Sequence, residues 1–112
     1  MLGIEWLAGL LEGEGSFHTS INRAGARPRI SVAMTDKDVM ERVARELETK
    51  VLGPYPHGPD GKYQPMYNVA VAGKRALGVM LTLYPEMGQR RRQQIKAVLS
   101  YWEHSGKEAD VL

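Results

Sequence analysis

The stretch of sequence that decides the fold lies near the start of the chain, where residues 7–15 read Leu-Ala-Gly-Leu-Leu-Glu-Gly-Glu-Gly. It predicts a short helix from Ile4 to Gly13 that is apolar on more than one side. Such a helix is expected to be buried on more than one side. Gly9 and Gly13 are four positions apart on one flank. By analogy with small-residue helix crossings in membranes, glycines at this spacing allow another helix backbone to approach closely.

Two acidic residues, Glu12 and Glu14, lie at the C-terminal end of this predicted helix. The helix dipole is already negative there, so each carboxylate is disfavoured by roughly 0.3–1 kcal/mol. A divalent cation would offset this cost, because hard cations such as Mg²⁺ prefer oxygen ligands. The alternative is that both residues are solvated surface acids that follow an apolar helix.

The segment after the helix predicts a β-hairpin. Residues 16–22 and 29–34 both alternate between apolar and polar side chains, which is typical of half-buried strands. Residues 23–28 are expected to form a flexible connection between them. The residues expected to face the core are Phe17, Thr19, Ile21, Ile30, Val32 and Met34. The opposite face of the hairpin is then polar and basic.

The rest of the chain predicts a second helix, two further strands and two more helices. The second helix begins with a capping-box-like segment at residues 35–38, in which Asp replaces the usual Glu or Gln, and runs to about Glu48. Its buried face is expected to carry Val39, Val43 and Leu47. The later elements are a strand at 51–55, a Gly/Pro-rich loop at 56–65, a strand at 67–71, a helix at 74–84 and a helix at 88–104 whose core stripe is Ile95, Val98, Leu99 and Trp102.

This order of elements predicts an α+β fold in which helices cover one face of an antiparallel sheet. The other face stays open, and a small sheet or two-stranded ribbon can enter the major groove of DNA. With 112 residues, 43% of them hydrophobic, the chain suits one domain with a modest core. We expect that domain at residues 1–104 and a C-terminal tail at residues 105–112.

Composition excludes several classes of site. The chain has no cysteine, which excludes disulfides and thiolate metal sites, and its three histidines lack the spacing of zinc ligands. The apolar start has no basic segment or cleavage site, and no apolar run is long enough to span a membrane. We therefore expect a soluble, intracellular protein without a targeting signal.

Charge is segregated along the chain although its net value is only +2. Between residues 15 and 35 there are three arginines and no acid, and between residues 87 and 102 there are Arg90, Arg91, Arg92 and Lys96, again with no acid. A basic face of this kind is expected of nucleic-acid binding. A patchy but inert surface is the alternative, because charge supplies affinity without sequence information.

The stretch at residues 7–15 resembles the LAGLIDADG motif of homing endonucleases position by position. It matches Leu, Ala, Gly, Leu, an aliphatic residue, an acid, a small residue, an acid and Gly, and Ser16-Phe17 continues as in many family members. The predicted elements from Ile4 to Trp102 resemble the family's αββαββα unit. A single motif in a short chain implies a homodimer that makes metal-dependent, site-specific double-strand breaks in DNA at a long pseudo-palindromic target. Such enzymes are typically encoded in introns or other mobile elements.

The resemblance also implies roles for particular residues. Glu14 corresponds to the acid that binds the metal, expected to be Mg²⁺ or another divalent cation such as Mn²⁺ or Ca²⁺, and the Gly13 carbonyl is the second implied ligand. Arg90 falls near the family's basic catalytic position. Asp36 falls near a polar catalytic position where relatives often carry Gln, so it is equally well explained as a helix-start acid. The implied dimer interface comprises Leu2, Trp6, Gly9, Leu10 and Gly13.

The predicted DNA contacts are the polar and basic side chains of the open face and of the last helix. They are Ser16, His18, Ser20, Asn22, Arg27, Arg29, Ser31, Tyr55, His57, Lys62, Gln64, Asn68, Arg91 and Arg92. Arg can read guanine, and Asn or Gln can read adenine, through paired hydrogen bonds. No small-molecule cofactor and no membrane partner is expected.

Two other functions stay open on the sequence alone. One is a non-cleaving nucleic-acid binder of the same fold, such as an intron-splicing maturase or a regulator. The other is an unrelated small α+β interaction domain, which would be monomeric and indifferent to DNA.

Overall fold

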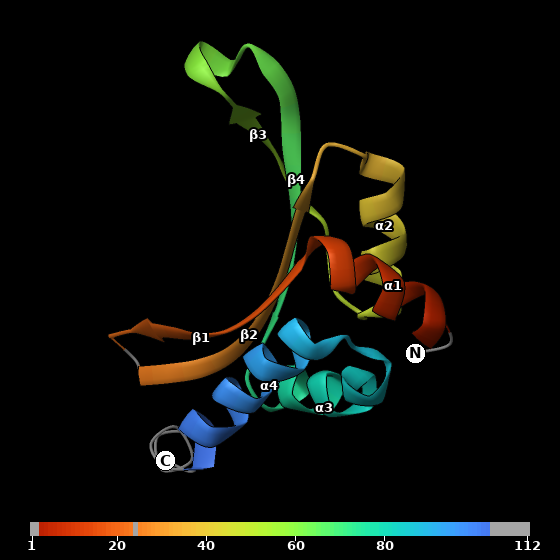
Figure 1. The fold of residues 1–112 in the computed structure, drawn as a ribbon. Coiled ribbons are helices and arrows are strands. Elements are labelled where there is room, and N and C mark those ends of the chain that lie inside the picture. The colour runs from red at the N-terminus through yellow and green to blue at the C-terminus, as the bar shows by residue number, and fades with distance from the viewer. Residues whose placement is uncertain (1–2, 24, 104–112) are drawn as a thin grey trace. The chain divides into compact units, whose positions relative to one another are not determined.

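The structure is a computed structural model that describes residues 3–23 and 25–103. Its main elements follow the predicted order and confirm the α+β class. They are α1 (Ile4–Glu14), β1 (Gly15–Asn22), β2 (Gly25–Met34), α2 (Lys37–Glu46), β3 (Leu52–His57), β4 (Tyr63–Ala72), α3 (Lys74–Leu83) and α4 (Gln89–Tyr101), with short 3₁₀ turns at η1 (Pro59–Gly61) and η2 (Tyr84–Glu86). The strands form one antiparallel sheet in the order β1-β2-β4-β3 (Figure 1). Leu2, His104 and the predicted tail lie outside the described residues.

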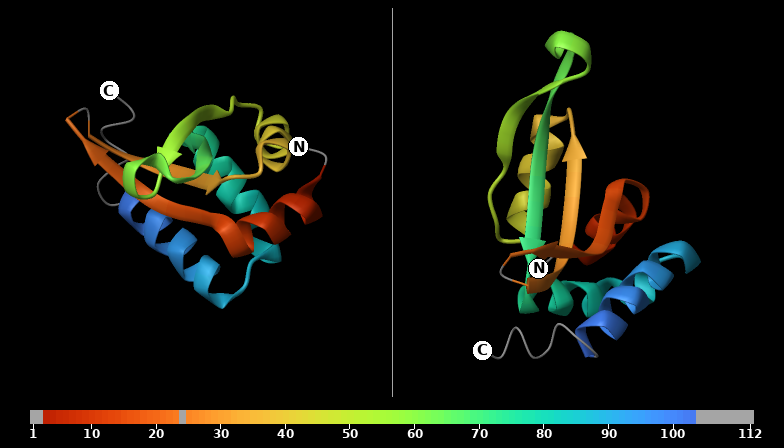
Figure 2. Two further views of the ribbon diagram at one scale, coloured as in Figure 1. Left: turned by 90° about the horizontal axis from the view of Figure 1, so that it is seen from above. Right: turned by 90° about the vertical axis from the view of Figure 1, so that its left-hand side faces the viewer.

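Contacts within the chain group it into two compact units, and β2 and β4 run from one into the other. The first unit comprises Met1–Gly15 and Ser31–Ala70. Its two helices, α1 and α2, lie on the same side of its strands (Figures 1 and 2). The Arg42 guanidinium carbon lies 3.9 Å from the Trp6 ring centroid, and Gly3 donates a backbone hydrogen bond of 2.8 Å to Glu46. Its most deeply buried side chains are Leu7, Leu11, Met40, Val43 and Val69.

The second unit comprises Ser16–Ile30 and Val71–Leu112. Within it, α3 and α4 lie on one side of the β1–β2 hairpin (Figures 1 and 2). The Gly73 N–H donates a 2.9 Å hydrogen bond to the Pro28 carbonyl, which joins the segment before α3 to β2. The side chains buried in this unit include Phe17, Ile30, Ala76, Met80, Leu83, Ile95 and Val98.

The predicted flexible connection at residues 23–28 is wrong for its last four residues, because β2 already begins at Gly25. Pro28 is buried inside the strand, where a missing N–H is tolerated if the pairing does not need it. The predicted inward position of Ile21 is also wrong, since 70% of this residue is exposed. Burial falls along β1 toward the hairpin turn, so the alternation of side chains no longer decides exposure there.

The predicted capping box is wrong as well. The N-cap of α2 is Asp36, no side-chain hydrogen bond caps the helix, and Val39 occupies the position three residues further on. An aliphatic side chain cannot return the second hydrogen bond of a capping box. The buried side chains of α2 are Met40, Val43 and Ala44, and Val39 is half-buried.

The predicted loop at residues 56–65 is wrong at both ends, where half of its residues belong to strands. β3 continues to His57, β4 begins at Tyr63, and η1 connects them. β3 is an edge strand whose pairing with β4 shifts register twice, and such strands tolerate prolines. At the other end of the chain, α4 stops at Tyr101, and Leu99 and Trp102 are half-buried rather than fully in the core. Within the described residues, none of the helices has the length and apolarity that crossing a membrane requires.

Candidate functional site

The junction between α1 and β1 places the Glu14 carboxylate at the surface. Glu14 is the last residue of α1 and is exposed. The chain turns directly into β1 because Gly15 has no side chain. A Cβ at Gly15 would lie 2.7 Å from Leu11 Cδ2 and 2.9 Å from the Leu11 carbonyl oxygen. The Gly15 N–H also donates its hydrogen bond to Leu11, which closes the last turn of the helix.

The glycine flank of α1, defined by Gly9 and Gly13, is uncovered. Both residues are exposed, and a Cβ built on either would meet nothing within 4 Å. The buried side of α1 carries Leu7, Ala8 and Leu11, while the implied interface residues Trp6 and Leu10 are half-buried. The sequence predicts burial of α1 on more than one side, and the described chain provides it on one. The glycine flank is therefore open to another helix.

The end of α1 offers oxygen donors of the type that a hard cation prefers. Glu14 supplies a carboxylate, and Gly13 is among the last residues of the helix, whose final carbonyls have no partner within the helix. Glu12 is half-buried and already engaged within the chain. Across residues 3–23 and 25–103, no group of three or more His, Asp or Glu side chains could hold a metal. The donors of one chain thus fit a Mg²⁺-like ion in chemistry but fill only part of its usual shell.

The predicted DNA contacts of the β1–β2 hairpin are all at least partly accessible. Ser16, Asn22 and Arg27 are exposed, and His18, Ser20, Arg29 and Ser31 are half-buried. The Ser16 hydroxyl oxygen lies 3.3 Å from Nδ1 of His18, so these two side chains form a hydrogen-bonded pair on one face of β1. Asn22 and Arg27 each have a polar or ring contact within the chain.

The second hairpin, formed by β3 and β4, presents a mixed aromatic and polar surface. The predicted contacts Tyr55, His57, Lys62 and Gln64 are exposed, and Asn68 is half-buried. Tyr63, which the sequence places in a loop, is 60% exposed, and its ring centroid lies 5.7 Å from that of His57. Its position beside a predicted contact could have been anticipated only by recognising that residues 63–65 belong to a strand.

The three consecutive arginines at the start of α4 face three different environments. Arg90 is exposed, whereas Arg91 is only 7% exposed and donates a 3.0 Å hydrogen bond to Gln94. Arg92 donates hydrogen bonds of 3.2 and 2.9 Å to the carbonyl oxygens of Tyr84 and Pro85. Arg91 and Arg92 therefore have structural contacts within the chain, and their contact with DNA stays a prediction. Arg90 is the one exposed member of the run.

Asp36 lies at a helix start, where an acid has an ordinary structural explanation. It is the exposed N-cap residue of α2, where acids and other small polar residues are preferred. No side-chain hydrogen bond from Asp36 caps the helix. A catalytic role for Asp36 stays a prediction.

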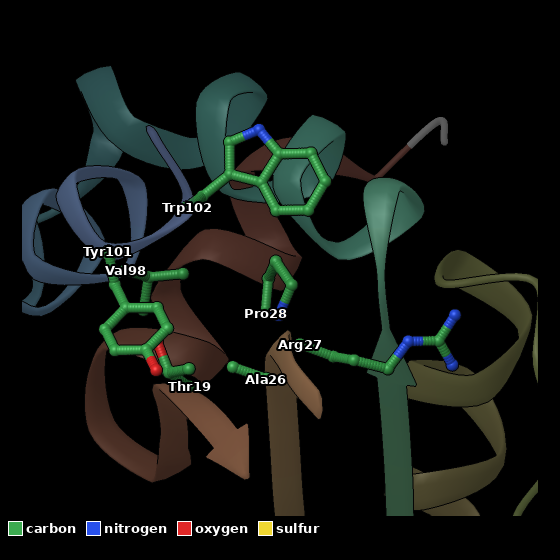
Figure 3. A pocket seen from close by; sticks show the side chains of 7 residues that line it. All are labelled: Thr19, Ala26, Arg27, Pro28, Val98, Tyr101 and Trp102. Atoms are coloured by element: carbon green, nitrogen blue, oxygen red, sulfur yellow. The ribbon is translucent and has the colours of Figure 1, made fainter. Parts of the chain in front are cut away.

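A small hollow lies between the β1–β2 hairpin and the end of α4. Figure 3 shows its seven lining side chains: Thr19, Ala26, Arg27, Pro28, Val98, Tyr101 and Trp102. The Arg27 side chain points away from Trp102 and Tyr101 (Figure 3), and the hollow leaves no space for a water-sized molecule. The side chains around it pack the hairpin against α4, and the hollow is not a ligand site.

No protein-family model matches the chain, and no curated protein sequence does. Solved structures do match. The homing endonuclease I-CvuI, solved with its DNA target in the presence of Ca, gives a TM-score of 0.66 with 17% identity, over 88% of this chain and 64% of I-CvuI. The archaeal intron-encoded homing endonuclease I-Vdi141I, complexed with DNA, gives 0.59 with 19% identity over 82% of this chain and 62% of that one.

The LAGLIDADG meganuclease I-AabMI, bound to uncleaved DNA, gives a TM-score of 0.67 with 13% identity. This match covers 91% of the present chain but 36% of I-AabMI. The chain thus spans less than two thirds of the length of each of these structures. The matches cover between 82% and 91% of the present chain. The chain therefore has the fold of the LAGLIDADG homing endonucleases, as the resemblance of residues 7–15 to their motif predicts.

Proposed function

We propose that this chain is one subunit of a homodimeric, divalent-metal-dependent DNA endonuclease of the homing type. The observation that supports this most strongly is the combination found on α1. An uncovered glycine flank runs along the helix and ends at an exposed carboxylate, Glu14. The glycine flank would form the contact between two copies of the chain, and the Glu14 carboxylate of each copy would contribute to a shared metal site.

The dimer follows from the open side of α1. Two α1 helices that pack through Gly9 and Gly13 can approach closely, because no side chain separates their backbones on that flank. The length of I-AabMI agrees with this arrangement. The present chain covers 36% of it, so a chain of that length has room for two such units. Two copies of the present chain would supply the same number of units.

Dimerisation completes the metal site. Packing of the two glycine flanks brings two Glu14 carboxylates near the dimer axis, where their like charges disfavour each other unless cations lie between them. Glu14 and the carbonyl of Gly13 would hold the ion, together with the same groups of the partner. A bound divalent cation supplies the positive charge that favours attack of water on phosphorus and departure of the leaving oxygen. I-CvuI has been solved in the presence of Ca and of Mg.

Arg90 is the arginine of α4 whose side chain is available to stabilise the reacting phosphate. It is exposed, it carries a permanent charge, and it has no hydrogen-bond or ion-pair partner among the described residues. A guanidinium group can donate two hydrogen bonds to phosphate oxygens, and this interaction strengthens as negative charge develops on them. We assign Arg90 this role in the proposed reaction.

The two hairpins supply the contacts with DNA. Arg27 and Arg29 follow one another on the same face of β2, and Ser16 and His18 do so on β1. Within the β1–β2 hairpin these polar side chains alternate with buried residues such as Phe17 and Ile30, and Arg27 also lines the hollow beside α4. Arginines there provide salt-dependent affinity, while the hydrogen bonds of individual side chains to base edges provide specificity.

The test begins by selecting cleaved duplexes from a randomised DNA library in the presence of Mg²⁺, which yields the substrate. The wild type is then compared with Glu14→Gln and with Glu5→Gln, which alters another exposed acid on α1. We expect cleavage by the wild type and Glu5→Gln, and binding without cleavage by Glu14→Gln. Binding by all three proteins with no cleavage by any would replace the nuclease by a non-cleaving binder. A monomer that ignores DNA would refute the proposal altogether.

A further inference from the structure

A groove on the helical side of the second unit has no role in the proposed cleavage reaction. It has a volume of about 450 Å³ and is lined by η2 and α4, through Tyr84, Met87, Gln89, Arg92, Gln93 and Lys96. No strand residue lines it, so it is not part of the open face of the sheet. Two cations and two primary amides face one another there, and no acid lines the groove.

The position of these side chains on α4 separates them from both the core and Arg90. With about 100° between successive residues of a helix, Gln89, Arg92, Gln93 and Lys96 fall within an arc of about 100°. The buried residues Arg91, Ile95 and Val98 lie on the opposite side of the helix. Arg90 points about a third of a turn away from the middle of the groove. The groove and the proposed catalytic arginine are thus on different flanks of α4.

The groove is held in place before any ligand binds. Two donor groups of the Arg92 guanidinium, Nε and Nη2, bind the carbonyl oxygens of Tyr84 and Pro85 at 3.2 and 2.9 Å. The guanidinium carbon also lies 5.3 Å from the Tyr84 ring centroid, so the cation is stacked against the wall of the groove. Its Nη1 group forms neither of these bonds. A charged group fixed in this way loses little conformational freedom when it binds an anion.

We propose that this groove binds phosphates of duplex DNA, as a second contact separate from the sheet. The two cations that line the groove make its charge complementary to a polyanion, and the stretch from Met87 to Trp102 contains no acid, although Glu86 directly precedes it. Lys96 binds a phosphate through a mobile ammonium group, and Arg92 binds one through a guanidinium group that is already held in place. The side-chain amides of Gln89 and Gln93 donate further hydrogen bonds to the phosphate oxygens. The contact is independent of base sequence. It rests on the proposed function only in naming DNA as the partner.

The test measures binding to a duplex that lacks the cleavage site, as a function of salt concentration. Each phosphate contact contributes roughly 0.9 to the slope of log K against log salt. We expect Lys96→Gln to reduce that slope by roughly 0.9. Gln93→Glu, which places an acid in the groove, should weaken binding further. The matched control is Lys37→Gln, because Lys37 is an exposed lysine on α2 and pairs with Glu41 at 3.9 Å.

The salt dependence of the variants decides between the possible outcomes. A loss of slope in Lys96→Gln but not in Lys37→Gln supports the groove, even if the wild type never cleaves DNA. Equal slopes in all variants, or no binding of duplex DNA by the wild type, would overturn the groove, whereas cleavage of a selected target by Lys96→Gln would leave the proposed nuclease intact. An RNA duplex that responds to Lys96→Gln while the DNA duplex does not would overturn the assignment to DNA.

Discussion

We predict that adding a side chain to the uncovered glycine flank of α1 raises the stability of the monomer and weakens its association into a dimer. Gly9 lies inside a helix, and a Cβ there would meet nothing within 4 Å in the single chain. Glycine in a helix interior is about 0.5–1 kcal/mol less favourable than alanine. Gly9→Ala should therefore stabilise the monomer by about that amount, which raises the melting temperature of a chain of this size by about 2–4 °C.

The same methyl group should weaken the proposed dimer. Each protomer would bring one extra methyl to a close helix contact, and inserting a methylene into a packed interface costs about 1–3 kcal/mol. The dissociation constant of the dimer should then rise roughly 5- to 150-fold. Sedimentation equilibrium measures this dissociation constant. Thermal unfolding at protein concentrations below the dissociation constant, where the protein is monomeric, measures the stability of the monomer without the contribution of association.

Gly78→Ala is the matched control. Gly78 lies inside α3, is exposed, and would likewise place its Cβ within 4 Å of nothing. It should give the same gain in monomer stability and leave the dimer unchanged. If Gly9→Ala and Gly78→Ala behave alike in association, the glycine flank is not the dimer interface and the reasoning about α1 is refuted.

Three further predictions test the junction after α1, its contact with α2, and the proposed catalytic arginine. Gly15→Ala should destabilise the chain by about 1–3 kcal/mol in denaturant unfolding, because its Cβ would press on Leu11, including the backbone; unchanged stability would contradict the tight helix–strand junction. Arg42→Gln removes the cation from the Trp6 ring and should cost about 0.5–1 kcal/mol, measured the same way, and a gain in stability would show that the contact is not favourable. Arg90→Gln should lower kcat about 10²-fold in single-turnover cleavage with little change in binding, and an equal loss of binding would reassign Arg90 to DNA affinity.

The elements that were predictable from sequence are those in which apolar periodicity and burial agree. The alternation that places Ile30 and Val32 in the core describes β2 correctly, and the apolar side of α1 is buried as its pattern requires. Prediction failed at Pro28 and at the β3–β4 turn, where residues that favour turns are held in strands by pairing with their neighbours. Local propensity is weaker than such tertiary pairing.

Some features of the candidate site were predictable from the sequence and others were not. The motif identifies Glu14 because the acid and the glycines around it form a contiguous pattern, and the structure places that acid at an exposed helix end. A run of three arginines does not reveal which of them is exposed. Each successive residue turns by about 100° around a helix, so the exposure of Arg90, Arg91 and Arg92 depends on how α4 is rotated against the core. Only the packed structure fixes that rotation.

The exposure of the edge strand β3 affects which substitutions such a protein can tolerate during evolution. Every residue of β3 is exposed, so a substitution there removes no core contact and, at positions other than the positive-φ residue Gly53, has a small effect on folding stability. A protein that reads DNA through this strand can alter its contacts one residue at a time while its core stays intact. When a target sequence drifts, recognition at this edge strand can follow it, and the leading helix α1 is left undisturbed.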